Sequence, residues 1–448
     1  MPAAATPVLL EDWIDPARVH AAFLDASHTF WLDAGPSATT GWSWVGIGSP
    51  ADAAELRRTP LERLHSDGAV TARGAAPDAP HRTGGPFRGG WVGWLGYESG
   101  ASDAGAPVAA DDLPAESWMR ADTLVAFDHA ARSVWIVAGD ADAVTRRIRI
   151  APDADVAAPP SAPVTAAARV GADDYARLIE DCRASIGRGE AYLLCLTTRF
   201  TVRGDIDPIA AHAALRAASP SHHGTLIRTG DVALVSASPE RFLEVADGIV
   251  RTRPIKGTRP RGASADDDAA LAADLAADPK ERAENVMIVD LMRNDLARVC
   301  DPATVTVERL LDIESYATVH QLVSTVAGRP RPGATVGDLW AATFPAGSMT
   351  GAPKLSAMTI LHRLEEEARG AFSGCFGWVG EDGRLDLAMT IRTVVTFPGG
   401  AYVSAGGGIT WASVPAAEVA EVALKASAPL RAIGATLPED WASRGPVT

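Results

Sequence analysis

The sequence changes character at Arg253-Pro-Ile-Lys-Gly-Thr-Arg-Pro-Arg-Gly262, a basic stretch that contains the lysine Lys256. Short apolar segments and the turn-like Ala246-Asp-Gly248 precede it, and a long segment that is both acidic and apolar follows it. This pattern predicts that Lys256 lies where a strand leaves a sheet, beside a carboxylate-rich helix. A lysine in that position can clamp a carboxylate, act as a base or act as a nucleophile.

The chain on both sides of this stretch predicts an α+β fold. Apolar periodicity predicts helices at 172–187, 207–217, 266–277, 279–298, 353–368 and 415–427. Strands are predicted at 192–202, 223–228, 232–237, 241–253, 304–313, 317–327, 373–380, 385–397 and 401–409. No strict alternation of strand and helix is present, so the strands should be mainly antiparallel. Aromatic segments at 30–33, 42–46 and 89–98 read as further strands of a companion sheet.

Bulk properties restrict the class of protein. The 448 residues are 47% hydrophobic and carry a net charge of −15, which argues against nucleic acid or an anionic membrane as a partner. The four cysteines are scattered, which indicates a reducing, cytoplasmic setting without disulfides or a zinc site. No apolar run approaches the roughly 18 residues of a membrane span.

Composition also suggests how the chain is divided. Stretches rich in Ala, Pro and Gly predict a mobile loop at 69–86 and a connection between two halves of the chain. We therefore expect an N-terminal region at 1–150, a linker at 151–170, a catalytic region at 171–432 and a tail at 433–448.

Two predicted helices carry carboxylates one turn apart. Glu281 and Glu284 share a face of the first, and Glu418 and Glu421 are followed by Lys425 on the second. Carboxylates facing each other from two helices would form an all-oxygen site suited to Mg²⁺. Either pair alone is more often a solvated helix face, because such spacings are frequent by chance.

Further segments could bind a ligand through the backbone or a single side chain. Thr343-Phe-Pro-Ala-Gly-Ser-Met-Thr-Gly-Ala-Pro-Lys354 leads small residues into a helix, whose free N–H groups could bind an anion. The glycines of Ser404-Ala-Gly-Gly-Gly-Ile-Thr410 would let a ligand touch a strand, or could form only a bulge. Arg392 could be a carboxylate fork or an outward strand residue. His320, taken alone, is more often structural than catalytic.

Taken together and in order, these stretches resemble the chorismate-utilising enzymes, namely anthranilate synthase component I, aminodeoxychorismate synthase component I and the isochorismate and salicylate synthases. The resemblance covers about 171–430 and, more loosely, Phe30-Trp-Leu-Asp and Gly93-Trp-Leu-Gly-Tyr-Glu98. It implies an anthranilate synthase component I-like fold, in which two large, mainly antiparallel β-sheets pack as a sandwich with helices outside.

The resemblance also implies a role for individual residues. Mg²⁺ would be bound by Glu284 and Glu421, with Glu281 and Glu418 near the metal. Glu240, in Ser238-Pro-Glu-Arg-Phe242, would be the general acid that assists departure of the C4 hydroxyl. His320 would lie near the substrate ring. The remaining substrate contacts would come from Thr258, Thr350, Arg392, Gly406, Gly407, Gly408 and Lys425.

Lys256 distinguishes between members of the family. Aminodeoxychorismate synthases resemble this chain in reading Pro-Ile-Lys-Gly-Thr, whereas anthranilate synthases usually have alanine at this position. The resemblance implies that Lys256 adds to ring C2 as the C4 hydroxyl leaves, and that ammonia then enters at C4 and expels the lysine. A nucleophilic lysine must be neutral, which requires burial or a nearby cation. The alternative is that Lys256 only clamps the substrate.

A second position, Leu193, argues against water as the nucleophile. Isochorismate and salicylate synthases resemble this chain in the surrounding strand but have a lysine base where Leu193 stands here. Leu193 also departs from the glutamine common in the amidating members, so a contact there could be missing.

We therefore expect the chorismate-aminating subunit of an aminodeoxychorismate synthase, serving p-aminobenzoate and folate or an arylamine natural product. Ammonia would come from a separate glutamine amidotransferase subunit, since no fused glutaminase domain is found. The alternatives are an anthranilate or 2-amino-2-deoxyisochorismate synthase component and a non-catalytic chorismate-binding subunit. Strong tryptophan binding is not expected, because Ser219-Pro-Ser-His-His223 replaces the family's feedback motif, although Leu24-Asp-Ala-Ser27 could be a remnant of that site.

Overall fold

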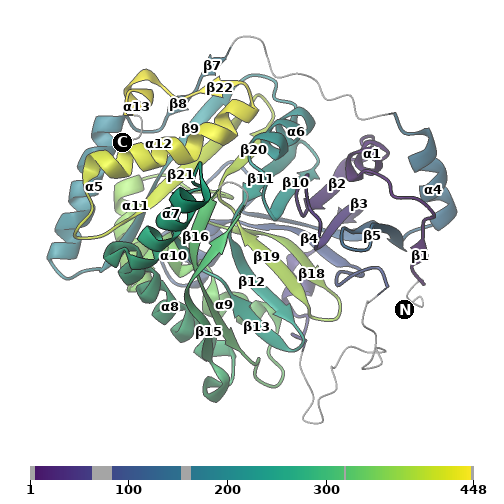
Figure 1. The fold of residues 1–448 in the computed structure, drawn as a ribbon, viewed down its shortest axis with the longest axis horizontal. Coiled ribbons are helices and arrows are strands. Elements are labelled where there is room, and N and C mark those ends of the chain that lie inside the picture. Colours follow the sequence, from purple (N-terminus) through teal and green to yellow (C-terminus); the bar gives the residue numbers. More distant parts are fainter. Residues whose placement is uncertain (1–5, 63–82, 153–162, 317–318, 445–448) are drawn as a thin grey trace.

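The computed structural model describes residues 6–62, 83–152, 163–316 and 319–444, which form layers of antiparallel strands and helices (Figure 1). Most of the loop predicted at 69–86, the middle of the predicted linker and the last four residues of the tail lie outside the described residues.

The strands form one continuous hydrogen-bonded network in which two runs meet at the long strand β5, Glu116–Asp128. In order of pairing, the first run contains β1 (Val8–Leu9), β6 (Ser133–Ala138), β5, β3 (Trp42–Pro50), β2 (His28–Asp33), β10 (His223–Thr229), β11 (Val232–Ser238), β20 (Thr393–Phe397), β21 (Gly400–Ile409) and β9 (Leu193–Arg203), with β8 (Ala167–Ala168) and β17 (Gly351–Ala352) at its edge. The second run contains β5, β4 (Gly90–Leu95), β18 (Cys375–Gly380), β19 (Leu385–Met389), β12 (Arg241–Ala246), β13 (Ile249–Thr252) and β16 (Val319–Gly328), which is flanked by β14 (Ile255–Pro260) and β15 (Thr306–Ser315). A separate parallel pair joins β7 (Val164–Thr165) to β22 (Ala435–Thr436).

Three apolar clusters show how the runs are layered. Between the two runs lies a cluster rich in aromatic side chains, in which Phe87 and Trp378 stack with ring centroids 5.0 Å apart. The outer face of the first run packs against α5 (Ala172–Gly187), α6 (Pro208–Ala218), α11 (Lys354–Glu365) and α12 (Pro415–Ala432). The outer face of the second run packs against α8 (Pro279–Val299) and α9 (Val336–Thr343). The predicted α+β sandwich with helices outside is therefore confirmed, with the two runs joined through β5.

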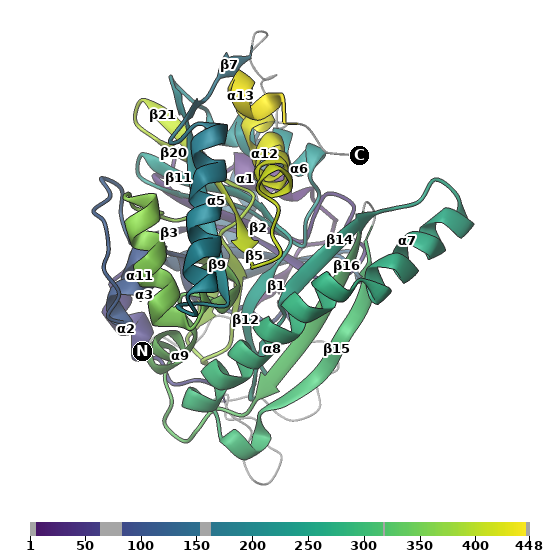
Figure 2. The same cartoon turned by 90° about the vertical axis from the view of Figure 1, so that its left-hand side faces the viewer.

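The remaining helices are short or lie at the periphery. They are α1 (Pro16–Ala21), α2 (Ala53–Arg57), α3 (Tyr97–Asp103), α4 (Ala141–Ile150), α7 (Ala265–Ala277), the 3₁₀ turn η1 (Pro302–Thr304), α10 (Gly347–Thr350) and α13 (Glu439–Ala442). Figure 2 shows α7 and α8 alongside β14, β15 and β16, the part of the second run that carries Lys256.

Some predicted strands differ in detail from the structure. The strand predicted at 241–253 is a hairpin, because Asp247 and Gly248 adopt left-handed φ angles of 53° and 66°. The strand predicted at 385–397 is interrupted before Thr393, where Arg392 has a φ of 52°. Lys256 does not lie where a strand leaves the sheet, since it is the second residue of β14.

Strands from the two ends of the chain pair directly with each other. β2 pairs with β10, and β4 pairs with β18, so the first 150 residues supply central strands of the same network as the rest. Among the described residues, no helix combines the length and the apolar character that a membrane crossing requires.

Candidate active site

Lys256 projects from an irregular part of β14. The register between β14 and β16 shifts between Ile255 and Thr258, and Gly257 between them has a φ of 81°, which L side chains rarely adopt. This bulge places Lys256 Nζ 3.5 Å from where a Cβ on Gly408 of β21 would lie. No described residue forms a hydrogen bond or a salt bridge with this ammonium. The amine is therefore available to a ligand beside the glycine strand.

Glu240 lies between β11 and β12 and is only 9% exposed. Burial raises the pKa of its carboxyl to about 7, against the opposing charge of Lys256. Its Oε1 accepts a hydrogen bond of 3.4 Å from Ser348 Oγ, and its backbone oxygen accepts one of 3.0 Å from Met389. A carboxyl with this pKa holds a proton near neutral pH, as a general acid must.

On α8, Glu284 is a buried carboxylate whose Oε1 has no hydrogen-bond partner. The neighbouring Asn285 fixes the helix against β16, because its Nδ2 donates to Leu322 O over 3.3 Å and its Oδ1 accepts from Ser324 Oγ over 2.6 Å. Burial raises the pKa of Glu284, and the positive charges of Lys256 and Lys280 oppose the shift. Burial likewise raises the pKa of Glu281.

On α12, Glu418 and Glu421 differ in their surroundings. Glu418 is buried, and its Oε2 lies 3.2 Å from the Cβ position of Gly407. Burial and the neighbouring Glu421 raise its pKa. Glu421 is half exposed and lies 2.6 Å from Lys425 Nζ, whose charge lowers the pKa of Glu421. Lys425 also donates to Gly406 O over 2.8 Å.

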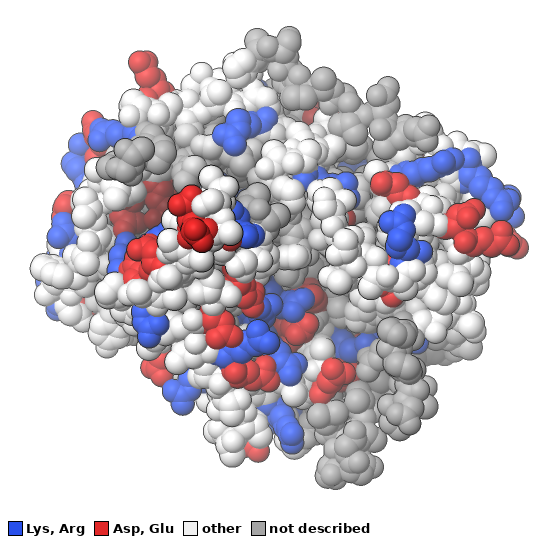
Figure 3. All heavy atoms as spheres, in the orientation of Figure 1, with Lys and Arg blue, Asp and Glu red and all other residues white. Residues whose placement is uncertain are grey.

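The four predicted metal-binding glutamates therefore lie close enough to influence one another's ionisation. Within the described ranges, no three His, Cys, Asp or Glu side chains are already arranged around one point as a formed metal site. Among the described residues Glu284 Oε1 accepts no hydrogen bond and has only the distant ammonium of Lys280, at 3.8 Å, as an ion-pair partner, and Mg²⁺ is often held by only one or two carboxylates together with water and substrate. The residues fit a magnesium site of this open kind. Figure 3 shows acidic side chains gathered over α7 and beside α12 on the same face of the molecule.

The glycines of β21 allow close approach rather than unusual backbone angles. A Cβ on Gly407 would meet only Glu418, whereas a Cβ on Gly408 would meet Lys256 and lie 3.1 Å from Leu193 Cδ1. Gly406 instead faces the backbone of β9, where Leu196 O lies 2.5 Å from its Cβ position. Leu193 therefore borders the same space as Lys256, and its side chain cannot act as a base.

Arg392 combines a left-handed φ with a guanidinium that forms no hydrogen bond or salt bridge to any residue that the structure describes. Burial lowers its pKa, and the charge of Glu421 opposes this effect. An unpaired guanidinium in such surroundings is suited to an incoming carboxylate.

Three predicted substrate or catalytic residues have other contacts. The buried Thr350 Oγ1 donates to Ala346 O over 3.1 Å, within its own short helix. Thr258 is exposed. His320 is buried with both ring nitrogens engaged, Nδ1 with Ser315 Oγ at 2.8 Å and Nε2 with Asp268 Oδ1 at 2.9 Å. The predicted roles of these three residues stay predictions.

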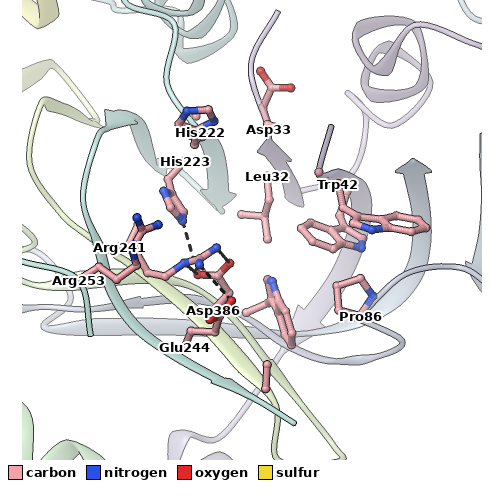
Figure 4. Close-up of a pocket in the computed structure, with 18 of the residues that line it drawn as sticks. Leu32, Asp33, Trp42, Pro86, His222, His223, Arg241, Glu244, Arg253 and Asp386 are labelled. Carbon is pink, nitrogen blue, oxygen red and sulfur yellow. Dashed lines mark hydrogen bonds and ion pairs between the residues drawn. The ribbon is translucent and has the colours of Figure 1, made fainter. Parts of the chain in front are cut away.

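A cavity of about 930 Å³ lies on the other side of β14, which carries Lys256, and of the connection between β11 and β12, which carries Glu240. Pro239, Arg241 and Ile255 line it, whereas Glu240 and Lys256 do not, as expected where successive strand residues point to opposite faces. Figure 4 shows Arg241, Glu244, Asp386 and His223 gathered on one side of it, and Arg241 is 3.0 Å from both carboxylates. The charged side chains on this side of the cavity thus form ion pairs with one another.

Sequence reasoning missed three residues of the site. Ser348 contacts Glu240, Asn285 orients α8, and Lys280 lies between the glutamates of α8 and α12. Lys280 and Asn285 stand in the helix predicted at 279–298, beside the glutamates, so their positions on its 3.6-residue period could have been considered. The contact of Ser348 depends on how its loop folds back.

Comparison with known proteins places the chain in one family. A family model described as chorismate binding enzyme matches residues 27–431. Aminodeoxychorismate synthase of Streptomyces pristinaespiralis is 38% identical over 93% of this chain, which spans 63% of that protein. Anthranilate synthase component 1 of Streptomyces coelicolor is also 38% identical, over 95% of this chain and 87% of that one. The crystal structure of anthranilate synthase component I from Streptococcus pneumoniae superposes with a TM-score of 0.72 and 27% identity, covering 96% of this chain and all of that one.

Proposed function

Because the chain belongs to the family of chorismate binding enzymes, we propose that it is the chorismate-aminating subunit of an aminodeoxychorismate synthase. It would convert chorismate and ammonia to 4-amino-4-deoxychorismate and water. The observation that supports this choice is the Lys256 side chain beside Gly408, whose amine has no hydrogen-bond or ion-pair partner among the described residues, at the position where anthranilate synthases usually have alanine. Overall identity does not decide between the two activities, since it is 38% to a relative of either name.

In the proposed reaction, Lys256 acts at ring C2 and Glu240 acts at the C4 hydroxyl in the same substitution step. The neutral amine of Lys256 forms a bond to ring C2, the ring double bond shifts, and the C4 hydroxyl departs as water with the proton of Glu240. Ammonia then bonds to C4, the double bond shifts back, and the C2–N bond breaks to release the neutral lysine amine. The proton that the new C4 ammonium loses returns to the Glu240 carboxylate. The amino group ends para to the ring carboxylate, and no oxidant or reductant is consumed. A protonated Glu240 also leaves Lys256 with one fewer negative neighbour.

Substrate binding would rest on the cations and amides around the glycine strand. The unpaired Arg392 guanidinium would bind one carboxylate, and Lys425 with the amides of Gly406 to Gly408 would bind near the other. Glu284 and Glu421 would hold Mg²⁺, with Glu281 and Glu418 beside it. Magnesium would neutralise the ring carboxylate and so reduce the cost of burying that anion.

The source of ammonia would be a partner glutamine amidotransferase subunit, in a pathway to p-aminobenzoate and folate or to an arylamine natural product. The S. pristinaespiralis relative is longer than this chain, which leaves room there for a further domain. A second candidate is an anthranilate synthase component, favoured by the match to the S. coelicolor and S. pneumoniae proteins.

Identification of the product separates the candidates. Purified protein is incubated with chorismate, an ammonium salt and Mg²⁺, and the product is passed to an aminodeoxychorismate lyase. We expect p-aminobenzoate by chromatography and mass spectrometry. Formation of anthranilate would refute the choice, and absence of turnover both with ammonia and with an amidotransferase would favour a binding subunit.

Replacing Lys256 by alanine tests covalent catalysis. Lys256→Ala removes the nucleophile but no hydrogen bond or salt bridge with a described residue, so the fold and chorismate binding should persist. We expect the para product to fall by at least about a thousandfold, on the scale of losing a catalytic nucleophile. Mass spectrometry of quenched wild-type enzyme should show a lysine adduct that the variant lacks. A variant forming the para product at the normal rate would exclude the covalent route.

A further inference from the structure

Lys280 bridges the two carboxylate-bearing helices. It is the second residue of α8, and its Nζ lies 3.8 Å from Glu284 Oε1 on the same helix and 3.8 Å from Glu418 Oε1 on α12. It is thus a positive charge between two carboxylates that come from opposite sides of the proposed cation site.

Glu284 and Glu418 are more buried than ordinary surface glutamates, so a nearby positive charge stabilises their ionised form more. Glu284 is 9% and Glu418 is 4% exposed, and Glu284 Oε1 accepts no hydrogen bond. Glu281 and Glu421 add further negative charge nearby. Buried like charges repel each other strongly. Lys280 is the one described residue that forms an ion pair with both carboxylates, so its removal would destabilise this arrangement.

The contact made by Lys280 is also easy to release. The Lys280 side chain is 49% exposed, and its four-carbon stem can swing the ammonium into water. Lys425 contrasts with it, because that ammonium is held at 2.6 Å by Glu421 and at 2.8 Å by Gly406 O. Lys280, which lies near the buried Glu284 and Glu418, is therefore held more loosely than Lys425.

We propose that Lys280 is a built-in counter-ion that fills the cation site of the metal-free enzyme and that Mg²⁺ must displace. The inference rests on the proposed function, because it takes Glu284 and Glu418 as part of the magnesium site. In part of the metal-free protein the Lys280 ammonium would occupy the cation site. The apparent dissociation constant for Mg²⁺ then equals the intrinsic constant divided by the fraction of molecules whose site is open. Lys280 would thereby weaken metal binding while stabilising the empty site.

The test measures binding of Mg²⁺ alone by isothermal titration calorimetry, without chorismate. Lys280→Met removes the competing charge and should bind Mg²⁺ about tenfold more tightly than the wild type. Arg282→Met is the matched control, since it removes one positive charge from the same helix. Among the described residues, the Arg282 guanidinium forms a hydrogen bond to Ala276 O, at 3.0 Å, and no ion pair. This control should bind Mg²⁺ as the wild type does.

A melting curve provides a second readout that does not depend on turnover. In EDTA, Lys280→Met should melt below the wild type, because its buried carboxylates lose their counter-charge. Saturating Mg²⁺ should raise its melting temperature by more than it raises that of the wild type. Lys280→Gln should behave in the same direction, which guards against a folding defect peculiar to methionine.

The outcomes separate this inference from the function on which it rests. If the wild type binds Mg²⁺ and Lys280→Met binds it equally or more weakly, Lys280 is not a competitor and the inference fails alone. If neither protein binds Mg²⁺, the metal site itself is wrong and the inference fails with it. Tighter binding in both lysine variants, with the arginine control unchanged, supports the inference.

Discussion

Glu240 is the residue whose ionisation the fold alters most usefully for catalysis. Because burial raises its pKa to about 7, it is protonated below neutral pH, about half protonated near pH 7, and deprotonated as the pH rises further. We expect the ammonia-dependent rate to fall as pH rises through about 7. Glu240→Gln should lower the rate by about 10²- to 10⁴-fold and remove this limb of the profile, measured as kcat/KM against pH. A limb that persists in the variant would assign it to another group.

The same shift predicts how stability depends on pH. The unfolded carboxyl should titrate near 4.5, so the folded protein binds the Glu240 proton more tightly than the unfolded chain does. The stabilisation from this group is complete below about pH 4.5 and is lost as the pH rises through about 7. Urea unfolding at several pH values should show that Glu240→Gln gains stability relative to the wild type across this range. A constant difference between the two proteins would contradict the raised pKa.

Among the secondary-structure elements, β21 creates space at the site because Gly406, Gly407 and Gly408 have no side chains. Gly408→Ala would place a methyl group 3.5 Å from Lys256 Nζ, which is ordinary contact, and 3.1 Å from Leu193 Cδ1, which is tight. The strand should fold, but the methyl group would occupy the space beside the lysine that the substrate would use. We expect kcat/KM to fall by about tenfold to a hundredfold. The melting temperature should change little.

A matched control comes from β10. Gly224 is also a strand glycine, but the atoms nearest to a Cβ there belong to Asp33 and lie at 3.4 Å or more, which is ordinary contact. Gly224→Ala should leave both kcat/KM and the melting temperature close to those of the wild type. Equal losses in the two variants would show that the strands, rather than the space beside Lys256, require glycine.

For the molecule as a whole, a buried ion pair connects the N-terminal region to the strands and helices of the site. Arg369 pairs with Glu365 at 2.7 Å and donates to Cys195 O and Met349 O, each at 2.7 Å. Its guanidinium lies 4.4 Å from the ring centroid of Tyr97, which comes from the first 150 residues. This network joins the N-terminal region, the glycine-facing strand β9 and the loop that reaches Glu240.

We therefore expect the described regions to unfold together. Glu365→Gln leaves the buried arginine without its counter-charge and should cost about 3–5 kcal/mol in the free energy of unfolding. Glu180→Gln, which removes the charge of an exposed pair with Arg183, should cost less than about 1 kcal/mol. Both can be measured by urea unfolding followed by circular dichroism. Two separate transitions in the wild type would show that the regions unfold independently.

The sequence by itself determined the elements and the chemical types of the site residues. Helix periodicity placed Glu281 with Glu284 and Glu418 with Glu421, and each pair lies on one helix as predicted. Strand and helix positions from 171 onward agree closely with the structure, because each reflects contacts between residues near in sequence. Turns inside two predicted strands were missed, since a single left-handed residue such as Arg392 leaves the apolar pattern unchanged.

Only the tertiary structure decided which of these residues meet. Antiparallel pairing and the bulge at Gly257 bring Lys256 beside Gly408, and loop folding brings Ser348 to Glu240. Burial, which no local pattern specifies, raises the pKa of Glu240 and leaves Glu284 Oε1 without a hydrogen-bond donor in the part of the chain that the structure describes. Local sequence sets the backbone preference of each segment, but the distance between two charges and their shielding from water depend on segments more than a hundred residues apart.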